Sequence, residues 1–149
     1  MRIFTVAMSC AFLLSCGTAR SFITATKNDA PCSEGSSCLC GQVLSSKAAL
    51  LEGARVVVYS EAHWVAERGK PLPQSVGSLS DDDIRPGDMG GTRATTDRMG
   101  RFCVSLHPDD RYLVVVLRHR MRPAAAIFPA GSNYAVALLV EGPEFRWGL

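Results

Sequence analysis

Short apolar segments separated by turn residues follow one another from residue 39 to residue 140. In residues 101–106 apolar side chains occupy every second position, which is typical of a strand with one buried face. Residues 112–117 are apolar or aromatic throughout, as in a central strand covered on one face and packed on the other. Four more segments have strand character: 39–44, 54–59, 124–128 and 134–140. In the last of them the larger side chains form one stripe: Tyr134, Val136, Leu138 and Val140.

Regular short strands with turn residues between them predict an all-β fold, a sandwich of about seven strands. No long amphipathic helix pattern follows the N-terminal region, and residues 46–51 could form at most one helical turn before Gly53. The segment 61–94 is a long interruption between two strong strands, and connections of that length are usually functional or disordered. We therefore expect a long loop there, in which Trp64 and Val65 extend the preceding strand or cover one end of the sandwich.

The N-terminus has the pattern of a secretory signal. After a basic start, residues 3–14 are almost all apolar or small, and this run is shorter than the about 20 residues that a transmembrane helix needs. We interpret residues 1–15 as a signal peptide and residues 16–37, which are small, polar and without periodicity, as a flexible tether. Residues 38–149 then form one domain.

The junction Leu13-Leu14-Ser15-Cys16 resembles the lipobox of bacterial lipoproteins, in which an aliphatic and a small residue precede an obligatory cysteine. In that family the cysteine thiol is lipidated and becomes the new N-terminus. The resemblance therefore implies that Cys16 carries a lipid anchor and that the membrane is a partner through this anchor. Acyl chains hold a protein durably because each buried methylene contributes about 0.8 kcal/mol.

The expected location is the cell envelope, on the outer membrane or on its periplasmic face. Gly17, in place of aspartate, resembles the outer-membrane sorting pattern of enteric bacteria. The alternative is an ordinary signal cut after Ala19 or Ala25, which would leave a soluble secreted or periplasmic protein. A formal net charge of +2 gives no electrostatic reason to expect a nucleic acid as partner.

Four cysteines remain outside the signal segment and the lipidation candidate: Cys32, Cys38, Cys40 and Cys103. An oxidising compartment permits disulfides, and four cysteines allow three connectivities. Cys103 alternates with the apolar residues of its segment and therefore points to the outer face, and Cys40 does so if Val43 points inward. Those two could meet on neighbouring strands, which would leave Cys32 to pair with Cys38. The spacing Cys38-Leu39-Cys40 lacks the two intervening residues of the usual zinc or redox pair, so disulfides are favoured over a metal site.

Residues from Leu39 to Leu117 resemble the carboxypeptidase regulatory-like domain, a transthyretin-like β-sandwich. The matching positions open two strands, form one tight turn and begin a tyrosine-led strand: Gly41, Val43, Gly53, Ala54, Thr96, Asp97, Gly100, Phe102 and Tyr112. In the turn, Asp97 can cap the backbone, Gly100 supplies a positive φ, and Phe102 enters the core. The resemblance implies a non-catalytic binding or structural module, with an unknown protein or glycan of the envelope as partner.

Two enzyme families share this kind of sandwich. Intradiol dioxygenases hold iron with tyrosines and a His-x-His pair, and the comparable segment 122–128 contains no histidine. Hydroxyisourate hydrolases end in Tyr-Arg-Gly-Ser, which residues 145–149 match poorly. No Gly-x-Ser-x-Gly elbow is present, and we expect His63 and His119 to be surface or strand residues rather than general bases. We therefore expect no enzyme, no metal and no other cofactor. The alternative is a metal-dependent enzyme on the same scaffold.

Two charged features could bind ligands. The run Asp81-Asp82-Asp83 with Asp88 could coordinate calcium, although acidic runs are usually only solvated. Three arginines would share one face if the strand at 112–117 continued further, and such a basic stripe could contact lipopolysaccharide or peptidoglycan: Arg118, Arg120 and Arg122. The favoured interpretation is a charged strand edge that blocks aggregation.

Overall fold

The structure is a computed structural model, and it describes residues 20–26, 38–80, 83, 91–106 and 110–142. These residues form eight strands, one α-helix and one short 3-10 helix at Val76–Ser78. The strands are β1 (Phe22–Thr26), β2 (Cys38–Ser45), β3 (Arg55–Ser60), β4 (Thr92–Thr95), β5 (Arg101–Ser105), β6 (Tyr112–Leu117), β7 (Ala124–Phe128) and β8 (Tyr134–Leu139), and the helix is α1 (Glu61–Arg68).

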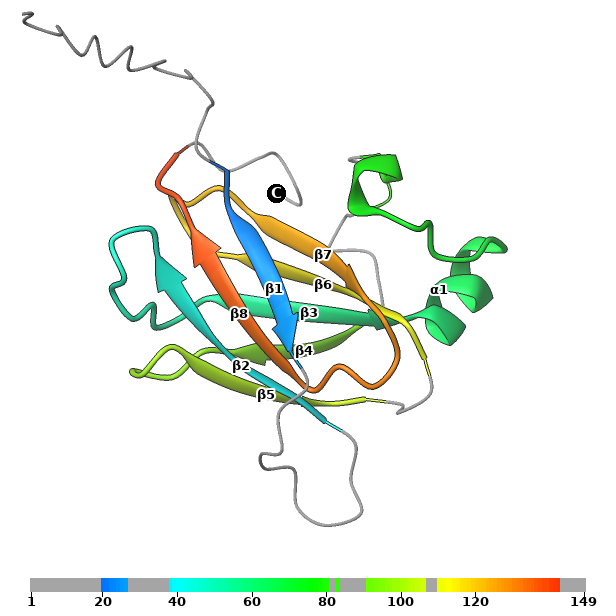
Figure 1. Ribbon diagram of the computed structural model, residues 1–149, viewed down its shortest axis with the longest axis horizontal. Helices are drawn as coiled ribbons and strands as arrows, with labels where there is room; N and C mark the ends of the chain where they lie inside the picture. Colours follow the sequence, from blue (N-terminus) through cyan, green and yellow to red (C-terminus); the bar gives the residue numbers. More distant parts are fainter. Residues whose placement is uncertain (1–19, 27–37, 81–82, 84–90, 107–109, 143–149) are drawn as a thin grey trace, which may run out of the picture.

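The strands form two four-stranded sheets that pack face to face, as Figure 1 shows. Sheet A has the order β1-β8-β2-β5, and sheet B has the order β4-β3-β6-β7. Within the sheets neighbouring strands are antiparallel, except that β2 and β8 are parallel. The prediction of an all-β sandwich is confirmed, and every segment predicted to be a strand contains one.

The main core lies between the two sheets. It contains the inward residues of both, among them Leu39, Val43, Val56, Val58, Phe102, Val104, Val114, Val116, Ala135, Ala137 and Leu139. On β8 the small side chains Ala135 and Ala137 face this core at 1% exposure, so the stripe of larger side chains lies on the outer face of sheet A. The sequence showed two faces on this strand, and packing decided which one is inside.

The turn before β5 is built by Thr96, Asp97 and Gly100. The buried Thr96 hydroxyl accepts a hydrogen bond from the Ala54 N–H at 2.9 Å and donates one to the Leu51 carbonyl at 2.6 Å. The Asp97 carboxylate accepts from the N–H groups of Met99 and Arg101. Gly100 has φ +69°, a backbone conformation that favours glycine. Phe102 follows and is 5% exposed, so this turn delivers its ring to the core.

The expected boundary of the domain at residue 38 needs correction, because β1 lies inside the segment interpreted as a tether. Phe22–Thr26 pairs antiparallel with β8, and Ile23 and Ala25 pack against the core. Five residues with one weak alternation do not identify a strand by themselves. Here the free edge of β8 supplies the hydrogen-bonding partner that makes the strand stable.

The long loop expected over residues 61–94 also needs correction, since it contains α1, the 3-10 helix and β4. The helix is capped at its N-terminus by Ser60, whose hydroxyl accepts from the His63 N–H, and at its C-terminus by Gly69 in the left-handed conformation. Trp64, on the buried face of α1, packs on the outer face of sheet B and does not extend β3. Eight residues are too few for their periodicity to stand out, and the helix depends on this packing.

Candidate functional site

The outer face of sheet B is covered by the chain itself. Side chains from β3 and β6 pack there under Trp64 and Leu72, forming a second apolar cluster with Val57, Tyr59, Leu113, Val115 and Leu117. We call α1 and Leu72, which lie over this face, the cover of sheet B. Arg111, just before β6, binds to both parts of it. Its guanidinium donates to both carboxylate oxygens of Glu61, at 2.9 and 2.7 Å, and to the carbonyls of Leu72 and Pro73. The hydrogen bonds from Arg111 lower the pKa of Glu61, so the pair stays ionised at neutral pH.

A second charged cluster holds the other end of the cover. The carboxylate of Asp83 lies 2.9 Å from the Arg68 guanidinium and 3.2 Å from the Lys70 ammonium, and it also accepts from the N–H and hydroxyl of Ser80. The Ser80 N–H is the main reason why the pKa of Asp83 is lowered, to about 2, and the Ser80 hydroxyl and Lys70 add to it. Asp83 is therefore engaged in ion pairs, whereas Asp81, Asp82 and Asp88 of the calcium hypothesis lie outside the described residues.

We expect the stabilising effect of Asp83 to disappear in acid. Its pKa is about 2 in the fold against 3.8 in a model peptide, so the charged carboxylate stabilises the fold above about pH 4 and stops doing so as the pH falls through about 2. Urea unfolding of the wild type and of Asp83→Asn should show a difference at pH 7 that narrows between about pH 4 and about pH 2. A difference that stays constant over this range would contradict the assignment.

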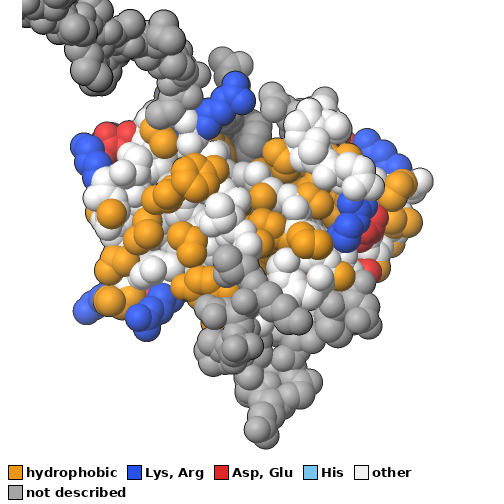
Figure 2. Space-filling view, viewed as in Figure 1, with side chains coloured by type: hydrophobic (Ala, Val, Ile, Leu, Met, Phe, Trp, Pro, Cys, Tyr) orange, Lys and Arg blue, Asp and Glu red, His pale blue; other side chains and the backbone are white. Residues whose placement is uncertain are grey.

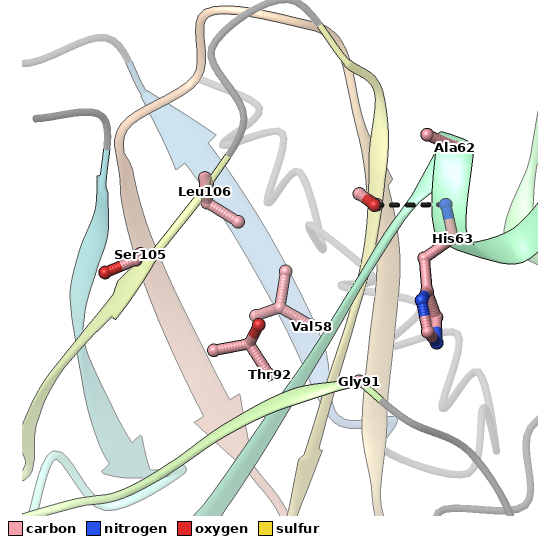
Figure 3. Close-up of a pocket in the computed structure, with 8 residues that line it drawn as sticks. Val58, Ala62, His63, Gly91, Thr92, Ser105 and Leu106 are labelled. Atoms are coloured by element: carbon pink, nitrogen blue, oxygen red, sulfur yellow. Dashed lines mark hydrogen bonds between the residues drawn. The ribbon is translucent and has the colours of Figure 1, made fainter.

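A cleft of about 490 Å³ opens where β4 and β5 diverge, next to the start of α1. Figure 3 shows Val58, Thr92 and Leu106 pointing into a shared space, while the Ser105 side chain points away from it. The His63 ring lies on the far side of β3. Ser60 and His63 also line the cleft, so its lining is both apolar and polar and suits a small ligand with polar groups.

His63 lies beside Glu67 on α1. Its Nε2 is 3.0 Å from a carboxylate oxygen of Glu67, one helical turn away. Figure 3 places the ring and the Ser105 hydroxyl on opposite sides of β3, so these two side chains do not form a nucleophile–base pair. Among the described residues, no three His, Cys, Asp or Glu side chains are grouped so that they could hold a metal.

A second, more open cleft of about 750 Å³ lies at the opposite end of the sandwich, and the arginine pattern leads to it. The expected stripe is wrong, because β6 ends at Leu117 and the chain turns at Arg120, which has φ 59°. The strand-edge interpretation is also wrong, since β6 lies between β3 and β7. Arg118 and Arg120 instead line the cleft together with the acidic residues Glu52 and Glu141.

The disulfide between Cys40 and Cys103 joins β2 and β5 on the outer face of sheet A. The two cysteines are directly paired in the antiparallel register and their sulfurs are 2.07 Å apart, which confirms the pairing predicted from strand parity. Cys38 is disulfide-bonded as well. Cys32, its predicted partner, and Cys16 lie outside the described residues, so that pairing and the lipidation stay predictions.

The outer face of sheet A carries an apolar row that the sequence did not reveal as a site. Phe22 pairs with Leu138, Leu138 with Leu44, and Leu44 with Leu50. Phe22 is 50% exposed and Leu50 is 42% exposed. Figure 2 shows hydrophobic side chains gathered over β1, β8 and β2. The stripe on β8 was visible in the sequence, but β1 and the pairing of the strands were needed to extend it into a row.

No protein-family model matches the chain, and neither does any curated protein sequence. Among solved structures it is similar to chlorocatechol 1,2-dioxygenase from Pseudomonas putida, with 12% identity, 84% of this chain and 73% of that chain covered, and a TM-score of 0.41. It is also similar to a 9R-lipoxygenase from Cyanothece PCC8801, with 16% identity, 83% of this chain and 19% of that chain covered, and a TM-score of 0.36. Likenesses at this level carry no argument about activity. The fold places the protein in the class of small all-β sandwiches with a cross-strand disulfide.

No helix in the described ranges has both the length and the apolar character that crossing a bilayer requires.

Proposed function

We propose that this protein is a non-catalytic lipoprotein of the cell envelope, held to a membrane by acylation of Cys16, whose sandwich binds or supports another envelope component. The observation that carries the proposal is the position of the lipobox-like junction. Cys16 precedes Phe22, the first residue of β1, by only six residues. Six residues span no more than about 22 Å, so the anchor would hold the sandwich directly at the membrane surface.

Replacement of Cys16 by serine tests the anchor. We expect Cys16→Ser to abolish incorporation of labelled fatty acid and to move the protein from the membrane fraction to the soluble fraction, because the serine hydroxyl does not take the place of the thiol. The matched control is Cys10→Ser, which removes the other cysteine of the N-terminal region and should leave both readouts unchanged. Unaltered acyl labelling in Cys16→Ser would remove the lipoprotein proposal.

The non-catalytic part of the proposal is supported by the positions of His63 and Ser105 on opposite sides of β3. The competing function is a metal-dependent enzyme on the same scaffold. Elemental analysis of the purified, detergent-solubilised protein separates the two: a binding module should contain iron and zinc far below one atom per chain. Stoichiometric metal that survives dialysis against a chelator would favour the enzyme.

A further inference from the structure

The two sheets differ in how their outer faces are covered. The outer face of sheet B is apolar and is closed by α1 and Leu72, which leave Tyr59 and Leu113 almost without exposure. The outer face of sheet A is also apolar along β8, but its two outermost apolar side chains, Phe22 and Leu50, keep 50% and 42% of their surface exposed. Contiguous exposed apolar surface in a folded protein usually marks a place of contact with a partner or a membrane.

The apolar row lies at the end of sheet A where the chain would arrive from the anchor. Phe22 is the first residue of β1, and the row runs from it across β8 and β2 to Leu50, a length of about 15 Å at the usual strand spacing. The start of β1 is fixed at this end by Ser21. Its hydroxyl accepts from the Val140 N–H at 2.9 Å and donates to the Arg122 carbonyl at 2.6 Å.

Cationic side chains lie in the segments at this end of the sandwich, where the Arg122 N–H donates to the Val140 carbonyl and the Gly142 N–H to the Arg120 carbonyl. They come from residues 20–21, from the turn after β2 and from the turn after β6: Arg20, Lys47, Arg118, Arg120 and Arg122. Arg20, Lys47 and Arg120 are exposed. The acidic side chains in the same segments are Glu52 and Glu141, so positive charge predominates. An apolar strip edged by cations matches the boundary between acyl chains and anionic headgroups.

We propose that the apolar row of Phe22, Leu138, Leu44 and Leu50 rests on the lipid bilayer, with its flanking cations at the headgroups. This inference rests on the proposed anchor at Cys16, because the row alone is too short to hold the protein on a membrane. With the anchor in place, the row sets the orientation of the sandwich. It turns sheet A toward the lipid and leaves α1, with the cleft beside it, facing away from the membrane.

The test uses the full acylated protein reconstituted in vesicles of phosphatidylethanolamine and phosphatidylglycerol, with tryptophan introduced at one exposed apolar position at a time. Phe22→Trp probes the row, and Leu50→Trp probes its other end. Val65→Trp is the matched control, because Val65 is 42% exposed and lies on α1, over sheet B. Fluorescence is measured with two quenchers: brominated lipid acts from the acyl region of the bilayer, and acrylamide acts from water. The emission of the unsubstituted protein is subtracted in each case.

We expect brominated lipid to lower the emission of the introduced tryptophan about two-fold in Phe22→Trp and Leu50→Trp, and to leave it nearly unchanged in Val65→Trp. Quenching of positions 22 and 50 by acrylamide alone would show that the row faces water and would overturn the inference while leaving the anchor intact. Protection from both quenchers would assign the row to a second copy of the chain and would also overturn it. Failure of the protein to float with the vesicles would overturn the anchor and the inference together.

Discussion

Replacing Trp64 with alanine is expected to lower the free energy of unfolding by about 3–5 kcal/mol, the usual range for removing a buried tryptophan. Trp64 is 1% exposed and lies between α1 and the outer face of sheet B. Its ring meets that of Tyr59 edge-on at 6.3 Å, and the Arg68 guanidinium lies 4.1 Å above it. No described residue accepts a hydrogen bond from the indole N–H, so we attribute the stabilising effect of Trp64 to apolar and cation–π contact.

The measurement is urea unfolding followed by circular dichroism, together with binding of a dye that reports exposed apolar surface. The neighbouring Val65→Ala is the control, since Val65 is 42% exposed on the same helix and should change stability by no more than about 0.5 kcal/mol. We expect Trp64→Ala to bind more dye, because the cover of sheet B is loosened. If both variants were equally stable, the cover would not depend on Trp64.

Gly41→Ala should lower the free energy of unfolding by about 3 kcal/mol or prevent folding altogether, because the core has no room for even a methyl group there. A Cβ at this position would lie 2.1 Å from the Ala135 carbonyl oxygen and 2.7 Å from the Phe102 ring. The carbonyl belongs to β8, which pairs with β2 in parallel, so relief would require the two strands to separate. Gly41 is therefore needed for close approach in the middle of sheet A.

The matched control is Gly77→Ala. Gly77 does not have a positive φ, and the nearest atom to an added Cβ is the Ser75 hydroxyl oxygen at 3.9 Å. We expect this variant to stay within about 0.5 kcal/mol of the wild type. Comparable losses from the two substitutions would contradict the contact with β8 and Phe102 as the cause, because the effect of Gly→Ala on the unfolded chain alone stabilises a protein.

The surfaces that could carry function were only partly visible in the sequence. Strand parity predicted that Cys40 and Cys103 would meet, and the disulfide confirms it. The arginine pattern predicted a stripe that does not exist, because parity applies only while a strand continues and β6 ends at Leu117. The apolar row combines residues from three segments that are far apart in the chain, and no local pattern connects Phe22 with Leu50.

The all-β class, most of the strands and the turn from Thr96 to Phe102 could be predicted from the sequence, because they depend on local alternation and on backbone preferences of single residues. The assembled fold determined that Phe22–Thr26 is a strand, since a short segment becomes one when a free sheet edge is available to it. It also decided that the stripe on β8 faces outward. Both faces of β8 are apolar, and the face with Ala135, Ala137 and Leu139 is inside. The Phe102 ring lies close to Gly41, the β2 partner of Ala135, so a small side chain fits at that point of the core.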